Sequence, residues 1–290
     1  MYKRLFISIL ILFAAVVFAD EMTGISGTVE WDTLMIKSTV SLDLAKAGIK
    51  LPSGRTQGEL SLSSGYLTLI QPSLMDLQVD SSSTLADLII RGEFNVLDTE
   101  KFALKAQSVP PSLSSDLKKM TSSYTMNLTD ISAALLRHNR PSPVMRTLIP
   151  AASPLYTGII IIAADTLPFY GMRSTGLAVP CLFPKIWDSN MNLIYERNML
   201  ESRENTMVHY APLQSIFQDN PSGLTQDIID VAGNRPLRIF ARALYGINPT
   251  DLIIDNIDAM QIISSDENRR LLAEGKVVFI LNDSVLKKNF

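Results

Sequence analysis

The stretch SSDENRRLLAEGKVVFIL, residues 264–281, carries the clearest structural signal in the chain. Ser264, followed three residues later by a glutamate, has the capping-box spacing that starts a helix, and a pair of leucines supplies the buried side of that helix. Gly275 is a typical helix terminator, because glycine adopts the left-handed conformation without penalty. The uninterrupted apolar run 277–281 then predicts a buried strand. A helix followed at once by a buried strand indicates an α/β or α+β layer.

The rest of the second half extends this layer. Residues 156–164, YTGIIIIAA, form a continuous apolar run that predicts a central strand buried on both faces. Residues 236–244 alternate apolar and basic side chains, which favours a half-exposed strand over a short helix. Residues 192–195 predict a further strand. We therefore expect a mixed-sheet α/β module over residues 155–290.

The first half has its own pattern of strands and helices. Two β-rich runs within residues 27–44 surround a polar break and predict a hairpin. Residues 55–78 carry leucines and an isoleucine at spacings of three, four and seven, which predicts an amphipathic helix interrupted or restarted at Pro72. Residues 122–128 alternate like a strand. We expect a two-layer α+β module over residues 20–140, and hence an α+β protein of two parts.

A proline-rich segment separates the two modules. Four prolines fall within residues 141–154, and such a density prevents both a helix and a central strand. This segment is the predicted linker or crossing segment.

Residues 1–19 have the three parts of a secretory signal. Lys3 and Arg4 precede the apolar run 5–18, and the small residue Ala19 stands at a plausible cleavage point. The alternative is an uncleaved N-terminal anchor, although the run is short for a bilayer span. We expect export across the inner membrane and no transmembrane span after the signal is removed.

Charge and composition exclude some function classes. The chain has 290 residues, 47% of them apolar and 19% charged, with a net charge of −3. Removal of the signal leaves 24 basic and 29 acidic side chains, a net charge of −5. Nucleic acid is therefore not an expected partner, because phosphate binding needs a basic excess.

One cysteine and two histidines leave little for a disulfide framework or a Cys/His zinc site. Cys181 lies among apolar residues and is interpreted as a buried small hydrophobe, with intermolecular pairing as the alternative. His138 and His209 lie far apart in the sequence and in no ligand spacing. We expect no metal and no cofactor.

Three aspartates are spaced four and three apart, at Asp251, Asp255 and Asp258. On one helix face they could bind Ca²⁺, but they lack the alternating ligands and glycine of an EF-hand loop. A solvated acidic face is the favoured interpretation. Similarly, three arginines at Arg235, Arg238 and Arg242 could bind an acidic partner, or pair with local carboxylates, which is the favoured interpretation.

Nucleophile and nucleotide motifs are absent from the sequence, but a carboxylate pair leaves little trace in sequence. Glycoside hydrolysis needs two carboxyl groups at the right separation, and the candidates are Asp165, at a predicted strand end, and Asp188 beyond it. An aspartate that organises the following turn is the favoured alternative. Trp187 and Tyr195 could stack on a sugar, or fill the core.

The second half resembles bacterial envelope proteins related to the twenty-kilodalton outer-membrane lipoproteins and to FlgP-type flagellar accessory proteins. In the second half the matching residues are Tyr156-Thr157-Gly158, the isoleucine run to Asp165, Pro180, Leu182, Pro184-Lys185-Ile186, Asp188, Ile194-Tyr195, Pro236-Leu237, Ile239, Ala241, Gly246, Thr250-Asp251 and Val277-Val278. In the first half they are Gly54-Arg55-Thr56-Gln57, Val79-Asp80-Ser81, Thr84 and Asp87.

This resemblance implies small α+β modules without known catalytic residues that assemble into envelope or flagellar structures, with a lipoprotein-like first module. The chain lacks a lipidation cysteine after its apolar run, and residues 166–179 look like an insertion. We expect a non-catalytic envelope protein of the periplasm or the periplasmic face of the outer membrane, with envelope or flagellar proteins, or further copies of itself, as partners. Long irregular loops are usually functional, so the insertion 166–179 is the predicted partner-binding segment. The alternatives are a carbohydrate hydrolase that uses Asp165 and Asp188, and a periplasmic small-ligand-binding protein with an apolar pocket between its modules.

Overall fold

The hairpin predicted over residues 27–44 forms the centre of the first domain. In the computed structural model, which describes residues 22–138, 140–147 and 153–290, β1 (Thr23–Glu30) pairs antiparallel with β2 (Met35–Asp43). On its other side β2 pairs antiparallel with β7 (Lys119–Asn127). The sheet order is β18-β1-β2-β7-β5, and β6 also pairs with β7.

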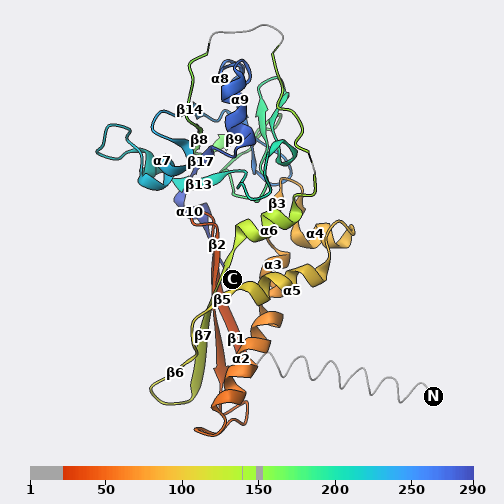
Figure 1. Cartoon of the computed structure of the whole chain (residues 1–290), viewed down its shortest axis with the longest axis vertical. Coiled ribbons are helices and arrows are strands. Elements are labelled where there is room, and N and C mark those ends of the chain that lie inside the picture. The colour runs from red at the N-terminus through yellow and green to blue at the C-terminus, as the bar shows by residue number, and fades with distance from the viewer. Residues whose placement is uncertain (1–21, 139, 148–152) are drawn as a thin grey trace, which may run out of the picture.

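Helices cover one face of this sheet (Figure 1). Every second residue of β2 from Ile36 to Leu42 is buried on this face, all of them apolar except Ser38, while Lys37 and Thr39 between them are exposed. Helix α2 (Arg55–Leu69) packs Tyr66 against Tyr124 of β7, with ring centroids 3.8 Å apart. The chain restarts as α3 (Gln71–Met75) with a proline in its first turn, which confirms the interruption predicted at Pro72.

The remaining elements of the first domain are short: β3 (Gln78–Asp80), β4 (Ser83–Thr84), α4 (Leu85–Ile90), α5 (Val96–Lys105), β5 (Gln107–Ser108), β6 (Ser112–Leu113) and α6 (Leu128–Leu135). β3 and β4 form an antiparallel hairpin, which lies beside the second domain (Figure 1).

The second domain is built on the two apolar runs that the sequence analysis singled out. β8 (Ile159–Ala163) lies inside a parallel sheet of order β13-β17-β8-β14. Ile160 and Ile161 are both fully buried, although they point to opposite faces, which confirms the prediction of a central strand. Burial alternates along β14 (Leu237–Phe240), as expected for a half-exposed strand.

The other elements of this domain are the remaining strands of its two four-stranded sheets and several short helices. The parallel sheet contains β13 (His209–Pro212) and β17 (Val277–Leu281), and a second sheet contains β11 (Ile186–Asp188), β12 (Leu193–Tyr195), β15 (Ala243–Tyr245) and β16 (Asp251–Ile254). The helices are η1 (Arg197–Met199), η2 (Leu213–Ile216), α7 (Gln226–Ala232), α8 (Asn256–Ile263), α9 (Asp266–Ala273) and α10 (Asp283–Leu286). The protein is thus an α+β protein of two domains, as predicted.

The start of α9 differs by one residue from the prediction. Ser265, not Ser264, is the N-cap, and its hydroxyl accepts the backbone N–H of Asn268 at 3.2 Å. The reason is that α8 continues to Ile263, so that Ser264 is taken up as the C-cap of α8. Gly275 ends the region with φ of +72°, as expected.

The end of the chain returns to the first domain. β18 (Lys287–Asn289) pairs antiparallel with β1, and Gly27 and Phe290 exchange two backbone hydrogen bonds of 3.1 and 3.0 Å. The predicted module 155–290 therefore gives its last strand to the sheet of the predicted module 20–140. This pairing ties the two domains together at the chain end.

The predicted linker 141–154 contains no helix or strand in its described residues, which are 141–147 and 153–154. The Ser142 amide donates to Asn198 O at 2.7 Å, so this part of the linker is bonded to the second domain. The predicted signal, residues 1–19, lies outside the described residues. Within the described ranges, no helix is long and apolar enough to cross a membrane.

Candidate functional site: the domain junction

The β3–β4 hairpin of the first domain is shaped by a carboxylate. Asp80 Oδ1 accepts both the backbone N–H and the hydroxyl of Ser82, each at 2.9 Å. Aspartate forms such turns readily, because its short side chain reaches the backbone two residues on. The turn leaves Ser81 at the tip of the hairpin, with only 8% of its surface exposed.

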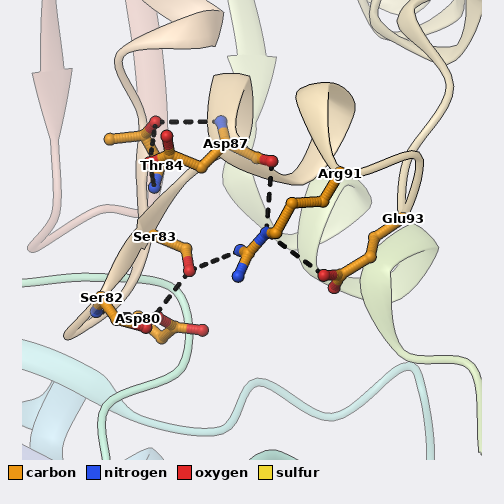
Figure 2. Close-up of polar contacts among 7 residues, drawn as sticks. All are labelled: Asp80, Ser82, Ser83, Thr84, Asp87, Arg91 and Glu93. Carbon is orange, nitrogen blue, oxygen red and sulfur yellow. Dashed lines mark hydrogen bonds and ion pairs between the residues drawn. The ribbon is translucent and has the colours of Figure 1, made fainter.

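A polar network on α4 holds the other arm of the hairpin (Figure 2). Thr84 and Asp87 form a capping box: Thr84 Oγ1 accepts the Asp87 amide at 3.3 Å, and Asp87 Oδ2 accepts the Thr84 amide at 2.8 Å. The hydrogen bond from the Thr84 backbone lowers the pKa of the Asp87 carboxyl. Arg91 donates to Ser83 Oγ at 2.6 Å and pairs with Glu93 at 3.2 Å. These contacts hold the hairpin in place within the first domain.

Asp251 of the second domain receives this hairpin. Its side chain is almost fully buried at the start of β16 and accepts four hydrogen bonds. Oδ2 accepts Ser81 Oγ at 3.0 Å and Trp187 Nε1 at 3.3 Å, and Oδ1 accepts the Lys185 amide at 3.1 Å and Thr250 Oγ1 at 3.2 Å. Burial raises the pKa of the Asp251 carboxyl, and the Lys185 amide opposes that rise most strongly.

This position corrects the interpretation of the three aspartates as one solvated helix face. Asp251 is a buried strand residue, whereas Asp255 is the N-cap of α8 and pairs with Arg242 at 3.1 Å. Only Asp258 lies within the helix. In the part of the chain that the structure describes, no group of three or more histidine, cysteine or acidic residues is arranged to hold a metal.

The backbone also crosses the junction. Three amides of the second domain donate to carbonyls of the hairpin: Leu182 N to Gln78 O at 3.1 Å, Phe183 N to Val79 O at 2.8 Å, and Asn248 N to Ser81 O at 2.8 Å. Gly246 lies so close to the hairpin that an added Cβ would stand 2.4 Å from Ser81 Cβ, at a backbone φ of +104°. Glycine is required there on both grounds.

A cavity of about 360 Å³ lies at the same junction. Both domains line it with apolar side chains, namely Trp31, Leu77, Val179, Pro180, Val285 and Phe290. Val29, the polar residues Ser73, Gln78 and Ser284, and the charged residues Asp76, Lys287 and Lys288 also line it, and Lys288 forms an ion pair with Asp76. The buried Ser81–Asp251 hydrogen bond and this largely apolar cavity therefore both lie where the two domains meet. We call the cavity the junction cavity.

The predicted carboxylate pair is divided between the two sheets of the second domain. Asp165 is exposed after β8, whereas Asp188 is buried at the end of β11. Asp188 accepts the backbone amides of Asn190 at 2.9 Å and Asn192 at 2.7 Å, and the Asn192 side chain at 2.8 Å. These bonds give Asp188 the turn-organising role that was the favoured alternative.

The insertion 166–179 is an ordered hairpin. β9 (Leu167–Pro168) pairs with β10 (Thr175–Gly176), and the Tyr170 amide donates to Leu244 O of the edge strand β15 at 2.8 Å. Its turn exposes Tyr170 and Met172, 45% and 66% of whose surfaces are accessible.

Tyr170 extends a row of aromatic rings. Tyr245 contacts Tyr170 edge-to-face at 6.3 Å and Trp187 at 5.6 Å. Tyr170, Met172 and Tyr245, which we call the hairpin patch, are all exposed. Trp187 is half-buried at the inner end of the row, while Tyr195 is fully buried and donates to Met207 O, so the core interpretation of Tyr195 is confirmed.

The single thiol and the arginines have local roles. Cys181 is buried, as predicted, and burial raises the pKa of its thiol. The three arginines each bond to a nearby group: Arg235 to Leu155 O, Arg238 to Ser222 O, and Arg242 to Asp255. The favoured interpretation, pairing with local carboxylates, is therefore confirmed for Arg242 alone, while Arg235 and Arg238 donate to backbone carbonyls.

Comparison with known proteins gives the same division into two domains. Residues 22–134 match the family model of the N-terminal domain of Treponema pallidum Tp0624, and residues 158–283 match the model of the second domain of Tp0624. No curated protein matches the chain. The chain is therefore similar, domain by domain and in the same order, to the N-terminal and second domains of Treponema pallidum Tp0624.

Proposed function

We propose that this protein is a non-catalytic component of a bacterial cell-envelope assembly and acts by binding other proteins. Residues 1–19 would direct it across the inner membrane, to the periplasm or the periplasmic face of the outer membrane. The resemblance to the twenty-kilodalton lipoprotein and FlgP-type families supports envelope or flagellar proteins as its partners. A locked junction between two domains suits a protein that holds partners in a fixed arrangement.

The hairpin patch is the observation that carries this proposal. Tyr170 and Met172 of the inserted hairpin and Tyr245 of the edge strand β15 gather large exposed side chains, and the hairpin is bonded to that strand. Aromatic residues and methionine are enriched where proteins bind one another. An ordered hairpin also loses little conformational entropy on binding.

A cross-linking pull-down from the native cells tests this proposal. The structure favours substitution over deletion of residues 166–179, because deletion would expose β15. The double variant Tyr170→Ser/Met172→Ser should lose the partner bands that the unmodified protein recovers. The matched control is Leu60→Ser/Ile90→Ser, which removes two exposed apolar side chains of the first domain. Equal recovery by the patch variant and the control would contradict the proposal.

The junction cavity supports a second candidate function, the binding of a small ligand. Its volume of about 360 Å³ falls within the range of about 300–1,000 Å³ that is typical of ligand pockets. Its walls come from both domains, which is where such pockets are often found. The hairpin patch does not line this cavity. Ligand binding in the cavity and protein binding at the patch would therefore be two separate activities of the same protein.

A further inference from the structure

A second cavity, of about 240 Å³, lies where the β1–β2 turn of the first domain meets β13, an edge strand of the second domain. Trp31 at the start of this turn contacts Tyr210 of β13 edge-to-face at 5.9 Å. The next two residues of the turn, Asp32 and Thr33, line one side of the cavity. Residues of the second domain line the rest, so the cavity, which we call the β13 cavity, needs both domains. It shares no lining residue with the junction cavity.

The two carboxylates that line the β13 cavity come from different domains. Asp32 belongs to the first domain and Asp227, in the first turn of α7, to the second, and no lysine or arginine is among the described residues that line it. In the part of the chain that the structure describes, neither carboxylate forms an ion pair. Lys37, the only basic side chain of the β1–β2 hairpin, pairs with Glu30 instead, and Lys287 also lies opposite Glu30 in the ladder. The charge of the cavity wall therefore favours a cation.

Ser215 places an unpaired hydroxyl in the wall of this cavity. The residue is only 8% exposed, and its hydroxyl has no hydrogen-bond partner among the described residues. Thr225, the N-cap of α7, also lines the cavity, and its hydroxyl does not cap that helix. A buried hydroxyl without a partner is costly, so an unpaired one in a cavity wall indicates that a bound molecule completes its hydrogen bonds.

His209 provides a further hydrogen-bond acceptor. Its side chain lines the cavity and, within the described ranges, has no hydrogen-bond partner. Burial lowers the pKa of the His209 imidazole, so the ring is neutral at neutral pH and one of its nitrogens keeps a free lone pair. Ile228, Val231 and Val278 add apolar surface to the same wall. The cavity thus combines acceptors for N–H donors, two negative charges and an aliphatic wall.

We propose that the β13 cavity binds a primary alkylammonium group, either of a small free amine or of a lysine side chain on a partner. The ammonium would donate its N–H bonds to a carboxylate and to the unpaired groups of Ser215 and His209, while the alkyl chain would lie against Ile228 and Val231. The volume is below the range of about 300–1,000 Å³ that is typical of ligand pockets, which suits one short chain. A metal ion does not fit, since no three histidine, cysteine or acidic residues of the described chain are arranged to hold one.

Nuclear magnetic resonance of the His209 ring gives a direct test, because the chain has only two histidines. Isotope-labelled histidine is incorporated, and the His209 signal is the one that is lost in His209→Gln. At neutral pH, n-butylamine should shift this signal saturably and leave the His138 signal unchanged. Two comparison compounds should bind at least tenfold more weakly: n-butanol, which lacks the charge, and butyltrimethylammonium, which lacks the N–H donors.

Two sets of variants locate the binding. Asp32→Asn/Asp227→Asn should weaken butylamine binding about tenfold, as expected for two exposed charge pairs. The matched control, Asp130→Asn/Asp165→Asn, also removes one exposed carboxylate from each domain, but neither lines the cavity, and the affinity should be unchanged. Ser215→Ala should weaken binding about threefold without lowering the urea midpoint of unfolding, because its hydroxyl has no partner to lose. Circular dichroism verifies that each variant folds.

A tripeptide with blocked ends, Ala-Lys-Ala, separates the two sources of the ammonium group. A saturable shift of the His209 signal by the tripeptide assigns the cavity to a lysine side chain, whereas a response to butylamine alone assigns it to a small free amine. Equal binding of butylamine and either comparison compound would overturn the proposal, and so would unchanged butylamine binding in the double aspartate variant. No saturable shift with butylamine or the tripeptide would also overturn it. None of these results bears on the pull-down that tests protein contact through the hairpin patch.

Discussion

The Ser81 hydroxyl donates a hydrogen bond of 3.0 Å to the Asp251 carboxylate, and the two residues belong to different domains. Asp251 is buried, and its four donors satisfy a charge that would otherwise be costly to remove from water. One of these donors, the Ser81 hydroxyl, comes from the first domain, so all four hydrogen bonds to Asp251 form only when the two domains are docked. The Ser81–Asp251 contact therefore acts as a specific lock between the domains.

Removal of the Asp251 carboxylate should destabilise the folded protein strongly. Asp251→Ala leaves the Ser81, Lys185 and Trp187 donors without their acceptor, and we expect a loss of about 3 kcal/mol in the free energy of unfolding. Ser81→Ala should cost about 1 kcal/mol, because it removes one bond and leaves no buried donor behind. Urea denaturation measures both values. Asp165→Asn, at an exposed carboxylate, is the matched control and should change the free energy by less than about 0.5 kcal/mol.

The raised pKa of Asp251 predicts how stability depends on pH. Between the unfolded value near 3.8 and the higher folded value, the native state binds more protons than the unfolded state, so the Asp251 contribution falls as pH rises. The free energy of unfolding of the unmodified protein, minus that of Asp251→Asn, should therefore decrease as pH rises above 3.8 and then level off. Other titrating groups cancel in this difference. A difference that increases with pH would show that the folded pKa is lowered.

The last strand should stabilise the first domain. Deletion of residues 287–290 removes the partner of β1, including the Phe290 carbonyl that accepts the Gly27 amide. We expect a loss of about 2 kcal/mol and much faster hydrogen exchange of the Gly27 amide. Lys287→Ala/Lys288→Ala keeps the backbone pairing and should leave that exchange rate nearly unchanged. Equal protection of Gly27 after the deletion would contradict the pairing.

The sequence predicted those strands and helices whose formation depends on neighbouring residues, namely on apolar runs and on turn-forming residues. The run 156–164 and the strand 277–281 are recognisable because a strand buried on both faces needs an uninterrupted apolar run. The hairpin over 27–44 and the break at Pro72 follow from turn chemistry and from the missing amide of proline. These features require no knowledge of distant contacts.

The junction could not be predicted in the same way, because its parts lie far apart in the sequence. Asp251 has helical spacing to Asp255 and Asp258, and only its pairing with Ser81 and Trp187 reveals a buried strand residue. β18 is short and polar, so it carries no strand signal of its own. One usable signal was present in the sequence. Asp251 stands directly before the apolar residues 252–254, and a carboxylate at the edge of such a buried run is a candidate for a buried, hydrogen-bonded side chain.

Site-specific photo-cross-linking tests the central claim, protein contact through the hairpin patch, most directly. A photoreactive phenylalanine analogue is placed at Met172 of the hairpin patch, or at Leu60 of α2 as an equally exposed control, and the cells are irradiated. We predict a discrete adduct of higher mass from position 172 that is absent from position 60. Adducts from neither position, or the same adducts from both, would contradict the claim that the hairpin patch is the surface through which this protein binds its partner.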